Sequence, residues 1–142
     1  MTDPDVRVVV AGADSELDAK LSAELTAFNE RVSGITDQRE FTVRLVEGDD
    51  LVAGLSGWTW GTHAGIGLVW VRDDARHRGW GTRLLGAAEQ VARERGCVRV
   101  SVSSFTFQAP EFYRRHGYVE TGRTEDLPVD GMADVHLVKL LG

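Results

Sequence analysis

The chain has 142 residues, 42% of them hydrophobic and 27% charged, so its size and composition predict one globular domain over residues 1–142. Its net charge of −6 argues against a nucleic-acid binder, which normally carries a basic excess. No apolar run reaches the roughly 20 residues that a membrane span needs. The acidic N-terminus lacks the layout of a signal peptide, and Cys97 has no second cysteine to pair with. We therefore expect a cytoplasmic protein that binds neither nucleic acid nor membrane.

The charges are distributed unevenly along the chain. Residues 1–71 hold 5 Lys and Arg against 12 Asp and Glu, whereas residues 72–142 hold 11 against 10. A polyanionic ligand in the second half and a cationic one near the first would suit this division. A solvated surface with accidental asymmetry is the competing interpretation.

The first half of the chain predicts a strand, a helix and then three strands. The apolar run 6–10 reads as a strand. Asp14 or Ser15 can cap a helix that Gly34 ends. The apolar positions of this helix follow the 3.6-residue period, and they are Leu17, Leu21, Leu25, Phe28 and Val32. Three strands then follow, most simply as an antiparallel meander, at residues 41–46, 51–60 and 66–71.

The second half predicts a mixed arrangement. A helix runs from Leu84 to Gly96, and a strand follows at 98–105; because a helix separates that strand from 66–71, we expect the two to be parallel. Pro110 opens a short helix that Gly117 closes. The last two strands are expected at 118–122 and 135–140. The fold class is therefore mixed α/β (α+β), with a β-rich first half.

Residues 76–82 carry the strongest functional signal. They read Arg-His-Arg-Gly-Trp-Gly-Thr and stand between a strand and the start of a helix. Unpaired backbone N–H groups and the helix dipole favour an anion there, and glycines let the backbone approach it closely. The run lacks the third glycine of a dinucleotide fingerprint and the Gly-Lys-Ser/Thr of a P-loop. A structural turn, or a nucleotide-binding fold of another class, remains as an alternative.

A second motif stands in fixed relation to the first. It is Phe112-Tyr113-x-x-x-Gly117-Tyr118, on the short helix, and it follows Arg76-x-x-Gly79-x-Gly81. In this order and spacing the two motifs closely resemble the GNAT superfamily of acyl-CoA-dependent N-acyltransferases. The resemblance covers about residues 41–140 and is strongest from 66 to 118.

The resemblance implies a mostly antiparallel sheet with flanking helices, in which two central parallel strands, 66–71 and 98–105, splay apart. It also implies that acetyl-CoA is the acyl donor and that no metal takes part. Pantetheine would bind to backbone groups where the two strands separate, and the loop would bind the pyrophosphate. Arg76, Arg78 and Arg83 would add charged contacts to phosphate. The cofactor-binding residues expected on this basis are Val69, Trp70, Val71, Arg76, His77, Arg78, Gly79, Trp80, Gly81, Thr82, Arg83, Ser104, Thr106, Ala109 and Phe112.

Tyr113 takes the position of the family's general acid, which protonates the departing thiolate. A phenol is protonated at neutral pH and can donate; packing beside Phe112 is the competing interpretation. The general base is open, because strand 66–71 has no acidic residue. His63, Asp73 and Glu47 are placed suitably along the chain, yet none is selected. Thr106 stands where the family often has asparagine, and the hydroxyl of Ser104 or Thr106 could substitute for it.

The acceptor site is less well marked. Trp58 and Trp60 share one strand face and could stack on a cationic or aromatic substrate, although packing is the commoner role of tryptophan. Phe28 and Asn29 are further candidates to line this site.

We therefore expect an N-acetyltransferase that transfers an acetyl group to a small-molecule or peptide amine by direct attack in a ternary complex. The alternative is a non-catalytic module of the same fold that binds or senses acyl-CoA. The resemblance also allows a homodimer, because dimers are common among GNAT proteins. His77, His116 and His136 show no metal-ligand spacing, and we expect no metal.

Overall fold

The computed structural model describes residues 5–75 and 78–142. Backbone contacts divide the chain into two units, Met1–Ile35 and Thr36–Gly142. The single domain expected over residues 1–142 stays a prediction.

The N-terminal unit holds the helix α1, Ser15–Ser33. The Asp14 carboxylate caps it by accepting a hydrogen bond from Leu17 N (3.0 Å). Gly34 ends it with φ at +75° and donates its N–H to the Glu30 carbonyl (2.9 Å). The predicted helix is confirmed at both ends, because its capping signals are local.

The strand expected at residues 6–10 is wrong. These residues form no strand, and no other segment in the described part of the chain pairs with them. A run of apolar residues favours extended backbone, but a strand exists only where a neighbouring strand satisfies its N–H and C=O groups. The apolar run alone carries no information on such a partner.

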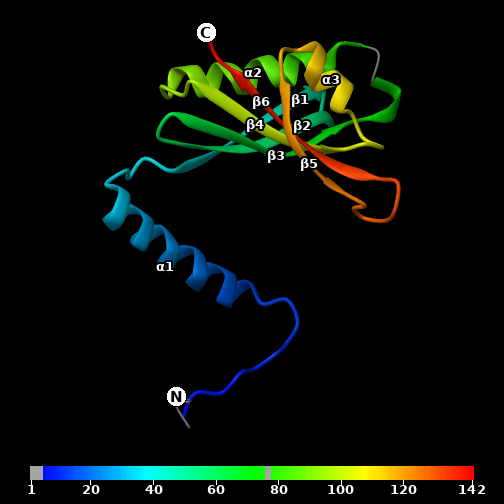
Figure 1. The fold of residues 1–142 in the computed structure, drawn as a ribbon. Coiled ribbons are helices and arrows are strands. Elements are labelled where there is room, and N and C mark those ends of the chain that lie inside the picture. Colours follow the sequence, from blue (N-terminus) through cyan, green and yellow to red (C-terminus); the bar gives the residue numbers. More distant parts are fainter. Residues whose placement is uncertain (1–4, 76–77) are drawn as a thin grey trace. The chain divides into compact units, whose positions relative to one another are not determined.

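The unit 36–142 is built on one six-stranded sheet (Figure 1). The strands lie in the order β1-β2-β3-β4-β6-β5, and only β3 and β4 are parallel. Their bounds are Arg39–Glu47 for β1, Asp50–Trp60 for β2, His63–Val71 for β3, Arg99–Phe105 for β4, Val119–Glu125 for β5 and Ala133–Leu140 for β6. The mixed, mostly antiparallel sheet predicted from the sequence is confirmed.

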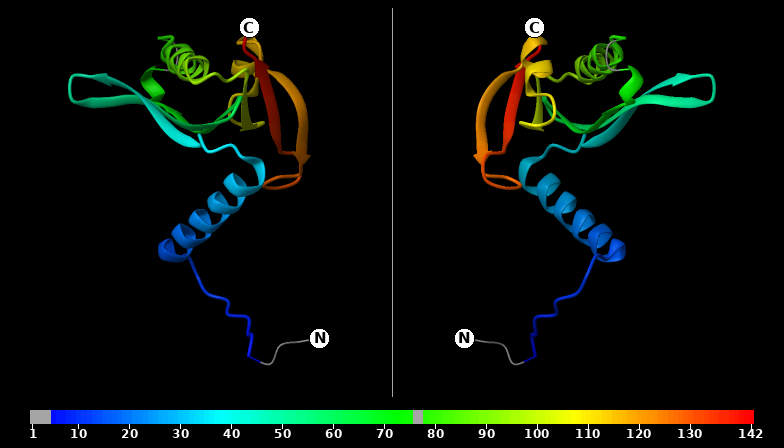
Figure 2. Two further views of the ribbon diagram at one scale, coloured as in Figure 1. Left: turned by 90° about the vertical axis from the view of Figure 1, so that its left-hand side faces the viewer. Right: turned by 90° about the vertical axis from the view of Figure 1, so that its right-hand side faces the viewer.

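Two helices of this unit lie on one side of the sheet (Figure 2). The longer, α2, spans Trp80–Glu94, and the shorter, α3, spans Pro110–Arg115; a single 3-10 turn, η1, covers Asp73–Ala75. The core lies between α2 and the sheet, and the largest fully buried side chains are Leu84, Val100, Val135 and Leu137. Within the described part of 36–142, no helix covers the opposite face of the sheet. Among the described residues, no helix is long and apolar enough to cross a membrane.

Among the starts of the elements, the largest differences from the predicted bounds are at β3 and α2, which both begin earlier than the sequence pattern indicates. Strand β3 starts at His63 rather than Ile66, because Ala64 and Gly65 pair with both β2 and β4 although neither is a typical strand residue. Helix α2 starts at Trp80 rather than Leu84, directly after Gly79 with φ at +74°. The Trp80 ring is buried, so the helix already packs on the core in its first turn.

Candidate functional site

The two central parallel strands separate soon after they meet. β3 and β4 pair only at His63–Arg99, Ala64–Val100 and Gly65–Ser101. Beyond that point residues 66–71 pair only with β2, and residues 102–105 pair only with β6. The edges that face each other therefore carry backbone groups without a strand partner, as a site for an extended amide-bearing chain requires. Val69, Trp70 and Val71, expected to hold pantetheine, lie on one of these edges.

A β-bulge coincides with this separation. Gly57 of β2 is opposite Ile66, and Ser56 is opposite Leu68, so Gly67 has no partner in β2. Such an extra residue bends its strand and locally increases the twist. The bulge gives a physical reason why β3 leaves β4 here.

The expected phosphate loop leads into the N-terminus of α2. Arg76 and His77 lie outside the described residues. Gly79 and Arg78 are exposed, and the helix begins with Trp80, Gly81 and Thr82, whose N–H groups precede the first intrahelical bond at Arg83 N (3.1 Å to the Gly79 carbonyl). An anion at this end would also be favoured by the helix dipole.

Guanidinium groups gather around the first turn of α2. Arg78 lies 5.5 Å and Arg72 lies 5.8 Å from the Trp80 ring centroid. Asp74 accepts a hydrogen bond from Arg72 Nε (2.6 Å), and this bond holds the pKa of the Asp74 carboxyl below its ordinary value. Arg78 makes no salt bridge among the described residues, although its charge also contributes to the lowered pKa of Asp74, and its guanidinium N–H groups could therefore bond to a phosphate.

The start of α2 is joined directly to α3. His116 Nδ1 donates to the Phe112 carbonyl (2.8 Å), and its Nε2 lies 3.0 Å from the Thr82 hydroxyl. A Cβ at Gly81 would come 3.2 Å from the Phe112 ring, so the glycine permits the close approach of the two helices. The first turn of α2 is thus in direct contact with the segment that bears Tyr113.

Tyr113 is 6% exposed and packs edge-on against Phe112 (5.2 Å between ring centroids) and Tyr118 (5.7 Å). Burial raises the pKa of the Tyr113 phenol above its ordinary value. The side chain therefore both packs in the core and keeps its proton at neutral pH, so the two interpretations of this residue are compatible.

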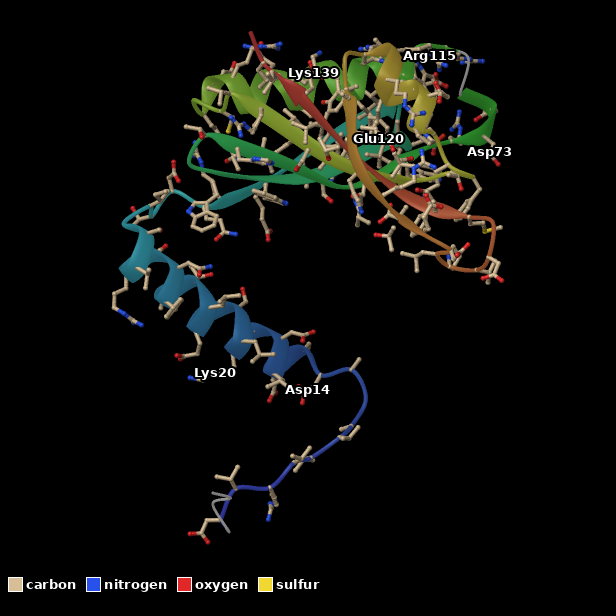
Figure 3. All side chains as sticks on the ribbon, viewed as in Figure 1. Asp14, Lys20, Asp73, Arg115, Glu120 and Lys139 are labelled. Carbon is tan, nitrogen blue, oxygen red and sulfur yellow. The ribbon has the colours of Figure 1, made fainter. Side chains whose placement is uncertain are left out.

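A buried polar cluster that the sequence did not indicate includes Tyr118, the neighbour of Tyr113. Glu89 of α2 is almost fully buried and accepts hydrogen bonds from the Tyr118 hydroxyl (3.0 Å) and from Lys139 Nζ (2.8 Å). Arg93 lies 3.9 Å from the same carboxylate. Figure 3 labels Lys139 on β6. One local signal was present: Glu89 interrupts the apolar stripe of α2 between Leu85 and Ala92.

The two hydroxyls proposed in place of the family asparagine both bond within the chain. Ser104 Oγ accepts from Ala109 N (3.1 Å), and Thr106 Oγ1 accepts from Ala133 N (3.2 Å). Ser104 is buried. Both residues fix the connection from β4 to α3; their contact with pantetheine stays a prediction.

The tryptophans fall into two groups. Trp80 is part of the core, whereas Trp58 and Trp60 lie half-buried on β2 and Trp70 is exposed on β3. Trp58 covers Gly65 and stacks on His63 with 5.7 Å between ring centroids and 11° between planes. It also lines a hollow of about 240 Å³, with Glu40, Phe41, Thr42, Ser56, Gly57 and Gly67.

The three candidate bases differ in setting. His63 Nε2 lies 2.9 Å from Ser101 Oγ, and burial, followed by the charge of Arg99, lowers the pKa of its imidazole. Glu47 ends β1, and Asp73 lies in η1 at the far end of β3 from His63 (Figure 3). None is singled out as the base. Phe28 and Asn29 lie on α1 in the N-terminal unit, and their part in an acceptor site stays a prediction. Among the described residues, no group of three His, Cys, Asp or Glu side chains is arranged to hold a metal.

Comparison with known proteins supplies the family. Residues 12–118 match the model of the acetyltransferase (GNAT) family. Blasticidin-S acetyltransferase of Streptomyces morookaense is 41% identical over 99 residues, covering 67% of this chain and 70% of that protein.

Solved structures of other proteins share the fold. An acetyltransferase from Bacillus cereus superposes with a TM-score of 0.79 at 29% identity, over 95% of this chain and 98% of that one. An aminoglycoside 6′-N-acetyltransferase complexed with coenzyme A gives a TM-score of 0.65 at 18% identity, over 85% and 91% of the chains.

Proposed function

This chain belongs to the GNAT family of acetyltransferases, and on that premise we propose that it transfers the acetyl group of acetyl-CoA to the primary amine of a small molecule. The observation that carries the proposal is that the N-terminus of α2, where an anion would be favoured, is in contact with the segment that bears a buried tyrosine. Thr82 of α2 contacts His116, which follows α3, and Gly81 of α2 lies against Phe112 of α3, next to Tyr113.

Acetyl-CoA is the donor substrate, and it supplies an activated acetyl group whose transfer leaves a thiolate. The residues present suit this molecule: Gly79 and the exposed helix N-terminus would receive pyrophosphate, and the unpaired edge at 69–71 would receive the pantetheine amides. Tyr113 would hold the proton at its hydroxyl and give it to the sulfur. Because burial raises the pKa of that phenol, it remains a donor throughout the neutral range.

The acceptor class follows from the most informative relative. Blasticidin-S acetyltransferase is 41% identical to this chain, so blasticidin S is the first acceptor to test. A small cationic amine also agrees with the acidic first half of the chain, where residues 1–71 hold 12 Asp and Glu.

The test is release of free thiol from acetyl-CoA across a panel of amines that includes blasticidin S. With an amine that is acetylated, Tyr113→Phe should lower kcat by about 10²-fold or more while leaving CoA affinity nearly unchanged, because general acid catalysis contributes on that scale. Tyr118→Phe is the matched control, because it removes the hydroxyl of a second tyrosine, whose ring centroid lies 5.7 Å from that of Tyr113. The Tyr118 hydroxyl is already bonded to Glu89. Undiminished turnover in Tyr113→Phe would contradict its assigned role.

One observation favours a second candidate, a non-catalytic module that binds acyl-CoA. Residues 66–71 read Ile-Gly-Leu-Val-Trp-Val, without a carboxylate to act as base. A thermal shift with CoA measures the property that both candidates share; a ligand at 100 times its Kd should add about 2.7 kcal/mol. Stabilisation by CoA with no thiol release on any amine would favour the module over the enzyme.

A further inference from the structure

The hollow beside Trp58 lies on the sheet face that α2 does not cover. In a strand, successive side chains point to opposite faces. Glu40 and Thr42 flank the core residue Phe41, and Trp58 and Ser56 flank Gly57, so all four point away from α2. The register pairs Glu40 with Trp58 and Thr42 with Ser56. Four side chains of two paired strands therefore surround one hollow of about 240 Å³.

The chemistry of this lining suits a cation. Glu40 contributes the one ionisable side chain among the residues that line the hollow, and it has no ion-pair partner within the described part of the chain. Opposite it stands an indole, whose face attracts a positive charge. Thr42 and Ser56 add hydroxyl oxygens that can accept hydrogen bonds from an ammonium or guanidinium group.

The indole is held in place from two directions. A Cβ at Gly65 would overlap the Trp58 ring, so the ring rests directly on the β3 backbone. His63 stacks on the same ring and is itself fixed by Ser101 (2.9 Å). Burial and Arg99 keep His63 neutral at neutral pH, because both lower the pKa of its imidazole. The stacked pair thus adds no positive charge that would repel a cation.

The hollow also reaches the place where the central strands part. Gly67, which lines it, is the bulge residue of β3. It lies two residues after Gly65, the last residue of β3 that pairs with β4, and two before Val69 on the unpaired edge. A molecule in the hollow is therefore next to the segment proposed to receive the acyl donor.

We propose that this hollow binds the acceptor by a second cationic group, distinct from the amine that is acetylated, with Glu40 as counter-ion and Trp58 as the aromatic wall. The preferred acceptors are then amines that carry another positive charge a few bonds away. This inference rests on the proposed function and assigns it a substrate class.

The test measures binding without turnover. The protein is saturated with CoA, which carries no acetyl group, and the indole N–H signal of Trp58 is followed by NMR and assigned with Trp58→Phe. The probes are 1,5-diaminopentane, which has two cations, and 5-amino-1-pentanol, which replaces one of them by a hydroxyl. We expect a saturable shift with the diamine, with a Kd about tenfold or more below that of the amino alcohol, as for a hydrogen bond to a charged group.

Glu40→Gln keeps the size of the side chain and removes its charge. It should raise the Kd of the diamine to that of the amino alcohol and leave the amino alcohol unchanged. Glu125→Gln, which makes the same change on β5, should leave both values unchanged and so control for net charge. Equal Kd values for the two probes, or no saturable shift, would overturn the inference.

The outcomes separate this inference from the proposed function. Thiol release on amines without a charge-dependent shift at Trp58 would support the proposed function and contradict this acceptor site. A charge-dependent shift with no thiol release on any amine would support the cation site and contradict the proposed acetyltransferase activity.

Discussion

The buried carboxylate of Glu89 offers a sharp test of how α2 is held against the sheet. Glu89 is 6% exposed and is the acceptor for the Tyr118 hydroxyl and the Lys139 ammonium group. Glu89→Ala removes that acceptor and leaves both donors behind. We expect this change to destabilise the protein strongly.

The magnitude follows from the two donors. The Tyr118 hydroxyl is buried, and leaving it unpaired costs about 1–3 kcal/mol. Breaking a buried ion pair on one side costs about 3–5 kcal/mol. The Lys139 side chain keeps 23% of its surface exposed, so its ammonium can turn toward water and the lower part of that range applies. We therefore expect Glu89→Ala to lower the free energy of unfolding by about 3 kcal/mol.

Two further variants separate the contributions of the charge and of the Tyr118 hydrogen bond to this change in the free energy of unfolding. Glu89→Gln keeps the volume and one acceptor oxygen but loses the charge, so we expect about 2 kcal/mol. Tyr118→Phe removes a single donor, and its effect should not add to that of Glu89→Ala, because the two residues share one hydrogen bond. A coupling of about 0.5–3 kcal/mol is expected in the double-mutant cycle.

The assay is urea unfolding followed by tryptophan fluorescence. All four tryptophans, Trp58, Trp60, Trp70 and Trp80, lie in the unit 36–142, so the signal reports on the unit that contains Glu89. A free energy of unfolding for Glu89→Ala within about 1 kcal/mol of the parent value would refute the reasoning, since it would mean that both donors find water at no cost.

Three other predictions concern pH and packing. Burial raises the pKa of Tyr113, so loss of its proton should not reduce kcat below pH 10. The kcat of Tyr113→Phe should therefore be lower than that of the parent protein by a constant factor over that range. A ratio of the two kcat values that changes below pH 10 would contradict the role of Tyr113 as general acid. The pKa of His63 is lowered in the folded protein, so the unfolded chain binds more protons and the free energy of unfolding falls as pH drops through 6.5. His63→Phe, which preserves stacking, should make the free energy of unfolding, measured in urea titrations from pH 5 to 7.5, depend less on pH. An equal slope of this free energy against pH in both proteins would contradict the role of His63. Gly65→Ala should displace Trp58, lower the free energy of unfolding by about 1–3 kcal/mol and abolish the diamine-dependent NMR shift, whereas Gly54→Ala, where a Cβ meets its nearest atom at 3.7 Å, should preserve that shift.

The local elements could be predicted because their signals are local. Asp14 and Gly34 set the ends of α1 through hydrogen bonds to residues three or four positions away. Pro110 opens α3 through its fixed φ, and Gly117 follows the end of α3 with φ at +92° and donates its N–H to the Arg114 carbonyl (3.1 Å). Such interactions need no knowledge of the rest of the fold.

Pairing between distant segments limited the prediction elsewhere. The run 6–10 has the composition of a strand but no strand partner in the described chain, and nothing in five residues states whether a partner exists. Conversely, His63, Ala64 and Gly65 look unlike a strand and are the only residues of β3 that pair on both sides.

The candidate site shows the same division. The glycines of the loop and the Tyr113 motif were visible in the sequence because each lies within a few consecutive residues. The cluster of Glu89, Tyr118 and Lys139 was not, since its members are up to 50 positions apart. Glu89 interrupts an apolar stripe, yet only the tertiary structure brings Tyr118 and Lys139 next to it.

The sequence by itself determined the type of most elements, the order of the two motifs and the family they resemble. Capping residues, hydrophobic period and glycine conformation act over one or two turns of chain, so they can be recognised without coordinates. Tertiary structure alone decided where β3 and β4 part, which residue of β3 bulges out of its pairing with β2, and that Glu40 lies beside Trp58 at a hollow. These features depend on strand register, and register is fixed only when segments far apart in the chain pair and bury a common face.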